Sequence, residues 1–137
     1  MPIPTGEQLQ LIRLTEANLL GCLFLEGAAG NQDAIKEVYK IVKPEDFFGY
    51  TIDDRHKRIY EAMLKSSATD YITVATTMHE NGTLLIDKTH YNDLSYMVSI
   101  VADVIGLDYE HYARQVAANA QEFLSGKQRG LKFKGGI

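Results

Sequence analysis

A chain of 137 residues, 45% of them hydrophobic and 23% charged, has the size and composition of one globular domain and is too apolar to remain disordered. Its formal net charge of −4 argues against a protein that holds duplex DNA by its phosphates, because such proteins present a basic surface. The single cysteine excludes an intrachain disulfide and a multi-cysteine zinc site.

Hydrophobic spacing predicts a first helix from Thr15, which is expected to be its N-cap. Leu20, Leu23 and Phe24 are assigned to the core, and Cys22 is interpreted as a small buried hydrophobic residue. The apolar run LLGCLFL is too short to span a bilayer. Acidic rather than basic residues precede it, which is not typical of a signal peptide. We therefore expect a cytoplasmic protein that does not bind membranes.

A second helix is predicted within NQDAIKEVYKIV, capped by Asn31 or Asp33 and with Val38 in the core. Pro44 ends it, because the residue before a proline is pushed out of the helical region. The turn PEDFFGY follows this helix and is expected to carry Phe47 into the core.

Residues 53–64 predict a third helix with Ile59 and Met63 in the core. Its first half, DDRHKR, is basic enough to suggest either a nucleic-acid patch or the solvated face of a helix. Arg55 and Arg58 fit either interpretation, and the residues alone leave the choice open.

The next helix is predicted in TVATTMHENG, between Thr73 as its cap and Gly82 just past its end. A fifth helix, in HYNDLSYMVSIV, is expected to place Leu94 and Val98 in the core, on one face with Tyr91, Met97 and Val101. The last begins at Asp108. Because no long alternating run predicts a sheet, the sequence indicates an all-α fold, a compact bundle of about six helices.

The last predicted helix carries an apolar and aromatic stripe at spacings of three and four. Its members are Tyr109, Tyr112, Val116 and Phe123. Such a stripe is typical of a core or helix-partner face, although aromatic residues also stack on the bases of single-stranded nucleic acid. We predict that the exposed side of this helix is a self-association surface.

The sequence lacks the common motifs of nucleotide binding, of metalloproteases and of serine hydrolases. The chain contains no G-x-x-x-x-G-K-[ST], no H-E-x-x-H and no G-x-S-x-G. Its histidines, His56, His79, His90 and His111, fall in different predicted helices, a distribution more typical of structural histidines than of metal ligands. We therefore predict no catalytic, cofactor-binding or metal-binding residues. An enzyme that uses Cys22 or a histidine remains an alternative.

Three segments are expected along the chain: an N-terminal extension at 1–14, the helical domain at 15–124, and a basic Gly-rich tail or start of a linker at 125–137. The tail has four positive charges and no acidic residue, so removing them from the net −4 leaves −8 for residues 1–124. This distribution leaves open a small nucleic-acid-binding protein that uses the tail lysines.

Five stretches, in this order, resemble the N-terminal domain of the DnaB family of replicative helicases. They are EANLLGCLFLE, KPEDFF, HKRIYEAML, TVATTMHENGTL and YEHYARQV, and their order and approximate spacing hold over residues 15–122. In the first stretch, Glu16 and the pair Leu20-Gly21 occupy the family's places. In the third, the resemblance implies that His56 turns toward the core, whereas Arg55 and Arg58 lie on a solvated face and belong to a partner-binding surface. The chain departs from the family after the last stretch, where glycines interrupt the segment that in the family continues into a long helical hairpin.

The resemblance implies a non-catalytic module of DNA replication. It would pair with its own kind, contribute to the N-terminal collar of a hexameric ring, and offer a surface to primase or to a helicase loader in the primosome. ATP and Mg²⁺ would belong to the motor domain of a parent ATP-dependent DNA helicase, so no cofactor is expected in this chain and DNA would be contacted only indirectly. The alternative is a small stand-alone adaptor of a phage or mobile element that binds nucleic acid or regulates a helicase.

Overall fold

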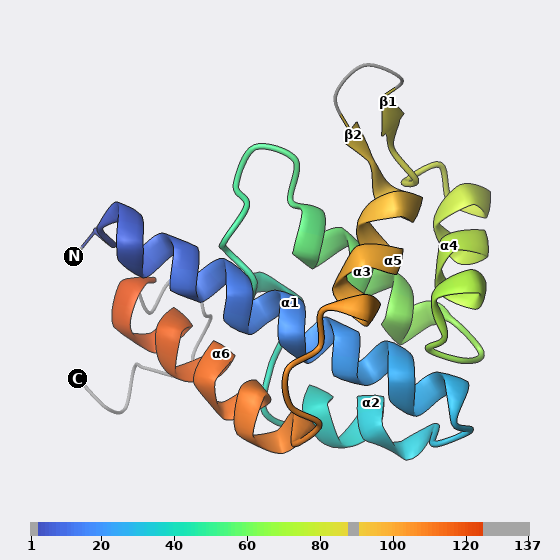
Figure 1. The fold of residues 1–137 in the computed structure, drawn as a ribbon, viewed down its shortest axis with the longest axis horizontal. Helices are drawn as coiled ribbons and strands as arrows, with labels where there is room; N and C mark the ends of the chain where they lie inside the picture. The colour runs from blue at the N-terminus through green and yellow to red at the C-terminus, as the bar shows by residue number, and fades with distance from the viewer. Residues whose placement is uncertain (1–2, 88–90, 125–137) are drawn as a thin grey trace.

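The computed structural model describes residues 3–87 and 91–124, and within them the chain forms an all-α fold, as predicted (Figure 1). The helices in chain order are α1 (Gly6–Ala28), α2 (Asp33–Tyr39), the short 3-10 helix η1 (Pro44–Asp46), α3 (Arg55–Lys65), α4 (Tyr71–Glu80), α5 (Asp93–Ala102) and α6 (Tyr109–Phe123). Two strands of two residues each, β1 (Ile86–Asp87) and β2 (Tyr91–Asn92), pair antiparallel before α5. They are too short to produce an alternating pattern, so the sequence does not predict them.

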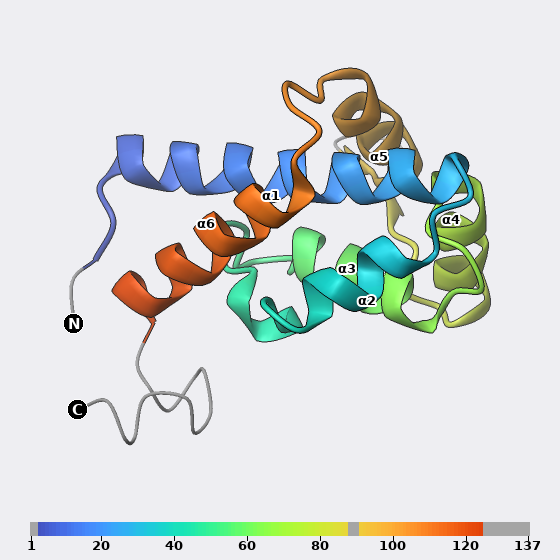
Figure 2. The same ribbon diagram turned by 90° about the horizontal axis from the view of Figure 1, so that it is seen from below.

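The longest helix, α1, is the spine of the molecule. It packs against α2, α3, α5 and α6, and in Figure 2 α5 lies on one side of it while α2, α3 and α6 lie on the other. Residues 18–24 in its second half are therefore all buried and contribute the centre of the core. Seven of the predicted core residues are buried as expected: Leu20, Leu23, Phe24, Val38, Phe47, Ile59 and Met63.

A close approach of backbones explains Gly21, the second residue of the Leu-Gly pair. A Cβ atom built on Gly21 would lie 2.4 Å from Val104 Cγ2 and 2.7 Å from the Ile100 carbonyl oxygen. Any side chain there would push the end of α5 away from α1. The absence of a Cβ therefore sets how closely the two helices pack.

The start of α1 differs from the prediction. The helix begins at Gly6 rather than near Thr15, because Thr5 and Gln8 form a capping box: Thr5 Oγ1 accepts from the Gln8 N–H at 3.1 Å and Gln8 Oε1 accepts from the Thr5 N–H at 2.8 Å. Thr15 lies inside the helix and its hydroxyl donates to the Leu11 carbonyl at 2.8 Å. A threonine in a helix interior can satisfy its hydroxyl in this way, so it need not mark a helix start.

The inward face of α5 is rotated from the one predicted, although Met97 belongs to both and is buried as expected. Leu94 and Val98 are 40% and 45% exposed, whereas Asp93, Met97 and Ile100 are buried. Both sets have helical spacing, and they differ by a rotation of about one residue. The buried carboxylate of Asp93 selects the second set, because it pairs with a side chain of α3 that the hydrophobic pattern of α5 cannot reveal.

Most helix boundaries agree with the sequence, but the N-caps of α2 and α4, like that of α1, differ from those predicted. The side chain of Asp70, not Thr73, caps α4: Asp70 Oδ1 accepts from the Thr73 N–H at 2.9 Å, and this bond lowers the pKa of the carboxyl. The N-cap of α2 is Gln32, which makes no capping bond. Gly82 follows the end of α4 with φ +72°, as predicted, and Asp108 caps α6 as predicted.

Candidate functional site

Behind the surface lies a buried polar network that joins three helices. Glu16 of α1, His56 of α3 and Tyr96 of α5 form a chain, with His56 Nδ1 2.7 Å from Glu16 Oε1 and His56 Nε2 hydrogen-bonded to the Tyr96 hydroxyl. Glu16 and His56 are both 1% exposed. The predicted inward turn of His56 is thus confirmed, and its purpose is to satisfy polar groups on two neighbouring helices.

The same glutamate holds the loop after η1. Glu16 Oε2 accepts from the Phe48 and Gly49 N–H groups, each at 3.0 Å. A Cβ atom on Gly49 would lie 2.7 Å from Glu16 Oε1, so only glycine fits against the carboxylate here. Glu16 and the Phe-Phe-Gly sequence are therefore parts of one structural device, although they are more than thirty residues apart.

The predicted solvent exposure of Arg55 is wrong. Its side chain is 19% exposed, pairs with Asp53 at 3.2 Å, and places its guanidinium 4.4 Å from the centroid of the Tyr50 ring and 4.8 Å from that of Tyr96. Arg13 covers Tyr50 as well, at 4.6 Å. Cation–π contacts of this kind hold the guanidinium against the aromatic rings at the edge of the core.

Arg58 is also turned inward rather than toward solvent. Its guanidinium donates to Asp93 Oδ2 at 2.7 Å, to the Thr83 carbonyl at 2.9 Å and to the Asp53 carbonyl at 2.7 Å. Asp93 is completely buried and accepts a further bond from the Leu85 N–H at 2.6 Å. The basic cluster DDRHKR is therefore mainly a clamp between α3, α5 and the segment after α4. Sequence periodicity could not distinguish this clamp from a solvated face.

The predicted stripe on α6 faces mostly inward. Val116 is 1% exposed, the Tyr109 hydroxyl donates to Glu37 of α2, and the Phe123 ring lies 6.3 Å from the Phe48 ring. Tyr112 packs against the core and against Gly106. Val116 therefore cannot belong to an exposed self-association surface, because α6 uses this face to cover α1 and α2.

The remaining candidates for chemistry are separated in the structure. His79 and His111 are exposed on different helices, and His90 lies outside the described residues. Residues 3–87 and 91–124 contain no group of three potential metal ligands. Cys22 is buried as predicted, and its burial, with the negative charges of Glu26 and Asp108, raises the pKa of the thiol to about 11. A protonated thiol is a poor nucleophile, which argues against the cysteine-dependent alternative.

An apolar groove with a volume of about 500 Å³ lies on the surface between α4 and α5. Ile72 of α4 is 64% exposed at its edge, and Leu94 and Val98 of α5 form the opposite wall. Ala75 and Leu84 continue the apolar lining. We call this surface the α4–α5 groove. The sequence alone does not reveal the α4–α5 groove, because Leu94 and Val98 have the same helical spacing as core residues.

A second groove, of about 470 Å³, lies between α2, the end of α3 and the segment that follows it. Its lining includes the apolar side chains of Ile35, Tyr39 and Leu64 and the two lysines Lys36 and Lys40. We call it the α2–α3 groove. It shares no lining residue with the α4–α5 groove, so the two surfaces can be occupied independently.

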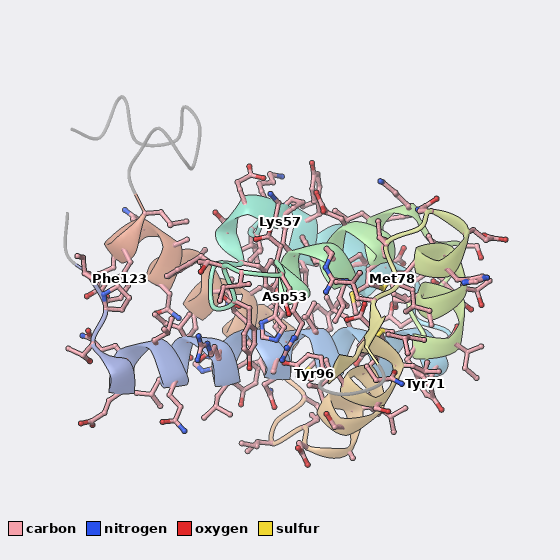
Figure 3. All side chains as sticks on the ribbon, turned by 90° about the horizontal axis from the view of Figure 1, so that it is seen from above. Asp53, Lys57, Tyr71, Met78, Tyr96 and Phe123 are labelled. Atoms are coloured by element: carbon pink, nitrogen blue, oxygen red, sulfur yellow. The ribbon has the colours of Figure 1, made fainter. Side chains whose placement is uncertain are left out.

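The two ends of the molecule differ. Figure 3 shows Phe123, the last residue of α6, near the beginning of α1, and Tyr71, the first residue of α4, at the opposite end. The α4–α5 groove therefore lies away from the end of α6.

Comparison with known proteins gives one family. A family model described as the DnaB-like helicase N terminal domain matches residues 10–118. No match was found among curated proteins or among solved structures. In the described part of the chain, no helix is both long and apolar enough to cross a membrane.

Proposed function

Since the chain belongs to the DnaB-like helicase N-terminal domain family, we propose that it is a non-catalytic association module of a replicative DNA helicase. It pairs with a second copy in the N-terminal collar of the ring and presents a further surface to primase or to a helicase loader. ATP hydrolysis and contact with DNA belong to the motor domain of the parent helicase.

The observation that carries this proposal is the α4–α5 groove. Ile72, Leu94 and Val98 leave a contiguous apolar surface on a chain whose formal charge is −4. Apolar patches of this kind on otherwise charged domains are typical of protein interfaces, where their burial removes water from the patch. Because the same patch occurs on every copy, two molecules can bury it reciprocally around a two-fold axis.

The exposed wall of α5 gives the test. Val98→Glu places a charge inside the paired surface, and we expect the dissociation constant for self-association to rise at least about tenfold, as measured by sedimentation equilibrium. The matched control is Ile52→Glu, since Ile52 is fully exposed in a loop that lines neither groove. A wild-type chain that stays monomeric at every concentration, or two variants with the same dissociation constant, would contradict pairing through this groove.

Association with the replication machinery needs its own measurement. We expect the purified primase or the helicase loader from the source cells to bind the chain in isothermal titration calorimetry. The size of the native product in those cells, detected with an antibody, distinguishes the helicase from the alternative adaptor. A product several times larger than 15.3 kDa supports a helicase subunit, whereas a product of this mass supports a stand-alone adaptor.

A further inference from the structure

The geometry of the α2–α3 groove points to a specific chemical class of partner: we infer that it binds an acidic amphipathic helix of another protein. The inference deepens the proposed function and rests on it, because it assigns a surface and a recognition chemistry to the partner that is not a second copy. Three features of the groove carry it: its apolar floor, its basic rim and its contrast with the rest of the surface.

The floor is apolar and accessible. Tyr39 and Leu64 are 42% and 37% exposed, although each lies beside buried residues of the same helix. Ile35, one turn before Tyr39 on α2, completes a row of apolar side chains along the groove. A volume of about 470 Å³ is sufficient for several apolar side chains of a partner. Two-helix grooves of this form receive the apolar face of a third helix, whose anchors are three or four residues apart.

The rim is basic. Lys36 and Lys40 are one turn apart on α2 and both line the groove, and Lys65 stands between the lining residues Leu64 and Ser66 in the sequence. Neither Lys65 nor Lys43 lines the groove, but Lys43 places its ammonium 3.6 Å from the centroid of the Tyr39 ring, which belongs to the floor.

Acidic side chains beside the groove do not neutralise this rim. Asp33 forms an ion pair with Lys36 at 3.9 Å, but both side chains are more than three-quarters exposed, and ion pairs in that setting are weak. Glu37 accepts the hydroxyl of Tyr109 and so faces α6.

The difference in charge between this groove and the rest of the chain indicates that the partner is acidic. The chain has a net charge of −4 and residues 1–124 have −8 once the four tail cations are removed, so an acidic partner is repelled over most of the surface. At this groove it meets lysines instead, which gives both orientation and specificity. The chain's own basic tail has the wrong sign to occupy the groove.

The probe is a synthetic peptide of about four helical turns with leucines at i, i+3, i+4 and i+7 and glutamates at the other positions. We expect it to bind with an affinity that falls as salt is raised, and to shift the amide resonances of α2 and of the end of α3 in NMR spectra. One control peptide has the same composition in scrambled order, so that its leucines do not share a face. A second has lysine in place of every glutamate.

Two variants test the two features of the groove separately. Lys36→Glu/Lys40→Glu reverses the rim, and we expect at least about tenfold weaker peptide binding. Leu64→Ser removes apolar floor at a partly exposed site and is expected to weaken binding severalfold even at high salt. The matched control is Arg114→Glu, because Arg114 is an exposed cation of α6 that lines neither groove. Circular dichroism checks that each variant retains its helices.

Each alternative result overturns the inference. Equal losses in Lys36→Glu/Lys40→Glu and Arg114→Glu would mean diffuse charge attraction. Equal binding of the scrambled peptide, or no effect of Leu64→Ser, would mean that no groove is used. No peptide binding would exclude the partner class. If the rim variant instead changes the dissociation constant for self-association, the occupant is a second copy. The proposed function fails separately, through Val98→Glu and Ile52→Glu.

Discussion

The Glu16–His56 region and the α4–α5 groove both depart from the usual rule that polar side chains are exposed and apolar side chains are buried. The first buries a carboxylate, an imidazole and a tyrosine hydroxyl between three helices, and the second leaves isoleucine, leucine and valine side chains in solvent. In the first region every buried group meets a partner inside the chain, so the result is a fixed arrangement of α1, α3 and α5. In the second no such partner lies within the described residues, so the apolar area remains available to another molecule.

The comparison teaches where to look for function in a small association domain. A cluster of charged and aromatic residues, such as DDRHKR with Tyr50 and Tyr96, suggests a site in the sequence but serves internal packing. Two ordinary aliphatic residues on α5 suggest core in the sequence but form the open surface. Burial decides between the two cases, since side-chain chemistry alone does not.

The largest effect is expected from breaking the clamp between α3 and α5. Arg58→Ala leaves the fully buried Asp93 carboxylate without its cation, which we expect to lower the free energy of unfolding by about 3–5 kcal/mol in urea denaturation. Arg114→Ala removes an exposed arginine paired with Glu110 at 3.4 Å and should change it by less than about 1 kcal/mol. Equal effects of the two substitutions would mean that Arg58 faces solvent like Arg114 and does not join α3 to α5.

Two neighbouring residues of α5 allow a buried and an exposed position to be compared on the same helix. Met97→Ala removes a fully buried side chain and is expected to cost about 2–5 kcal/mol of unfolding free energy. Val98→Ala, one residue later at an exposed position, should change it by no more than about 0.5 kcal/mol. Thermal unfolding of both variants measures the difference. A larger loss of unfolding free energy for Val98→Ala than for Met97→Ala would mean that Leu94 and Val98, not Met97, face the core.

A smaller effect is expected from a conservative change in the buried network. Glu16→Gln preserves the shape of the side chain but replaces one acceptor oxygen with an N–H₂ donor opposite His56 and two backbone N–H groups. At least one donor then loses its acceptor, which should cost about 1–3 kcal/mol in urea denaturation. The exposed Glu7→Gln is the control, with an expected change below about 1 kcal/mol. No difference between them would mean that the network does not contribute to stability.

Local patterns in the sequence were enough to predict the helical architecture, most helix ends and the seven core residues of α1, α2, α3 and the loop after η1. Helical spacing, capping side chains and glycine stops act over a few residues, so they are readable along the chain. The order of five short stretches also identified the family, which the match over residues 10–118 confirms.

Only the tertiary structure decided which of two equally spaced faces of α5 is buried, where Arg55 and Arg58 point, and that the stripe of α6 covers the body. Each outcome depends on a partner far away in the chain: Asp93 for Arg58, Tyr96 for the Arg55 guanidinium, Glu37 for Tyr109. A buried charge needs its counter-charge more strongly than a leucine needs burial, so Asp93 set the rotation of α5 and left Leu94 and Val98 in the α4–α5 groove.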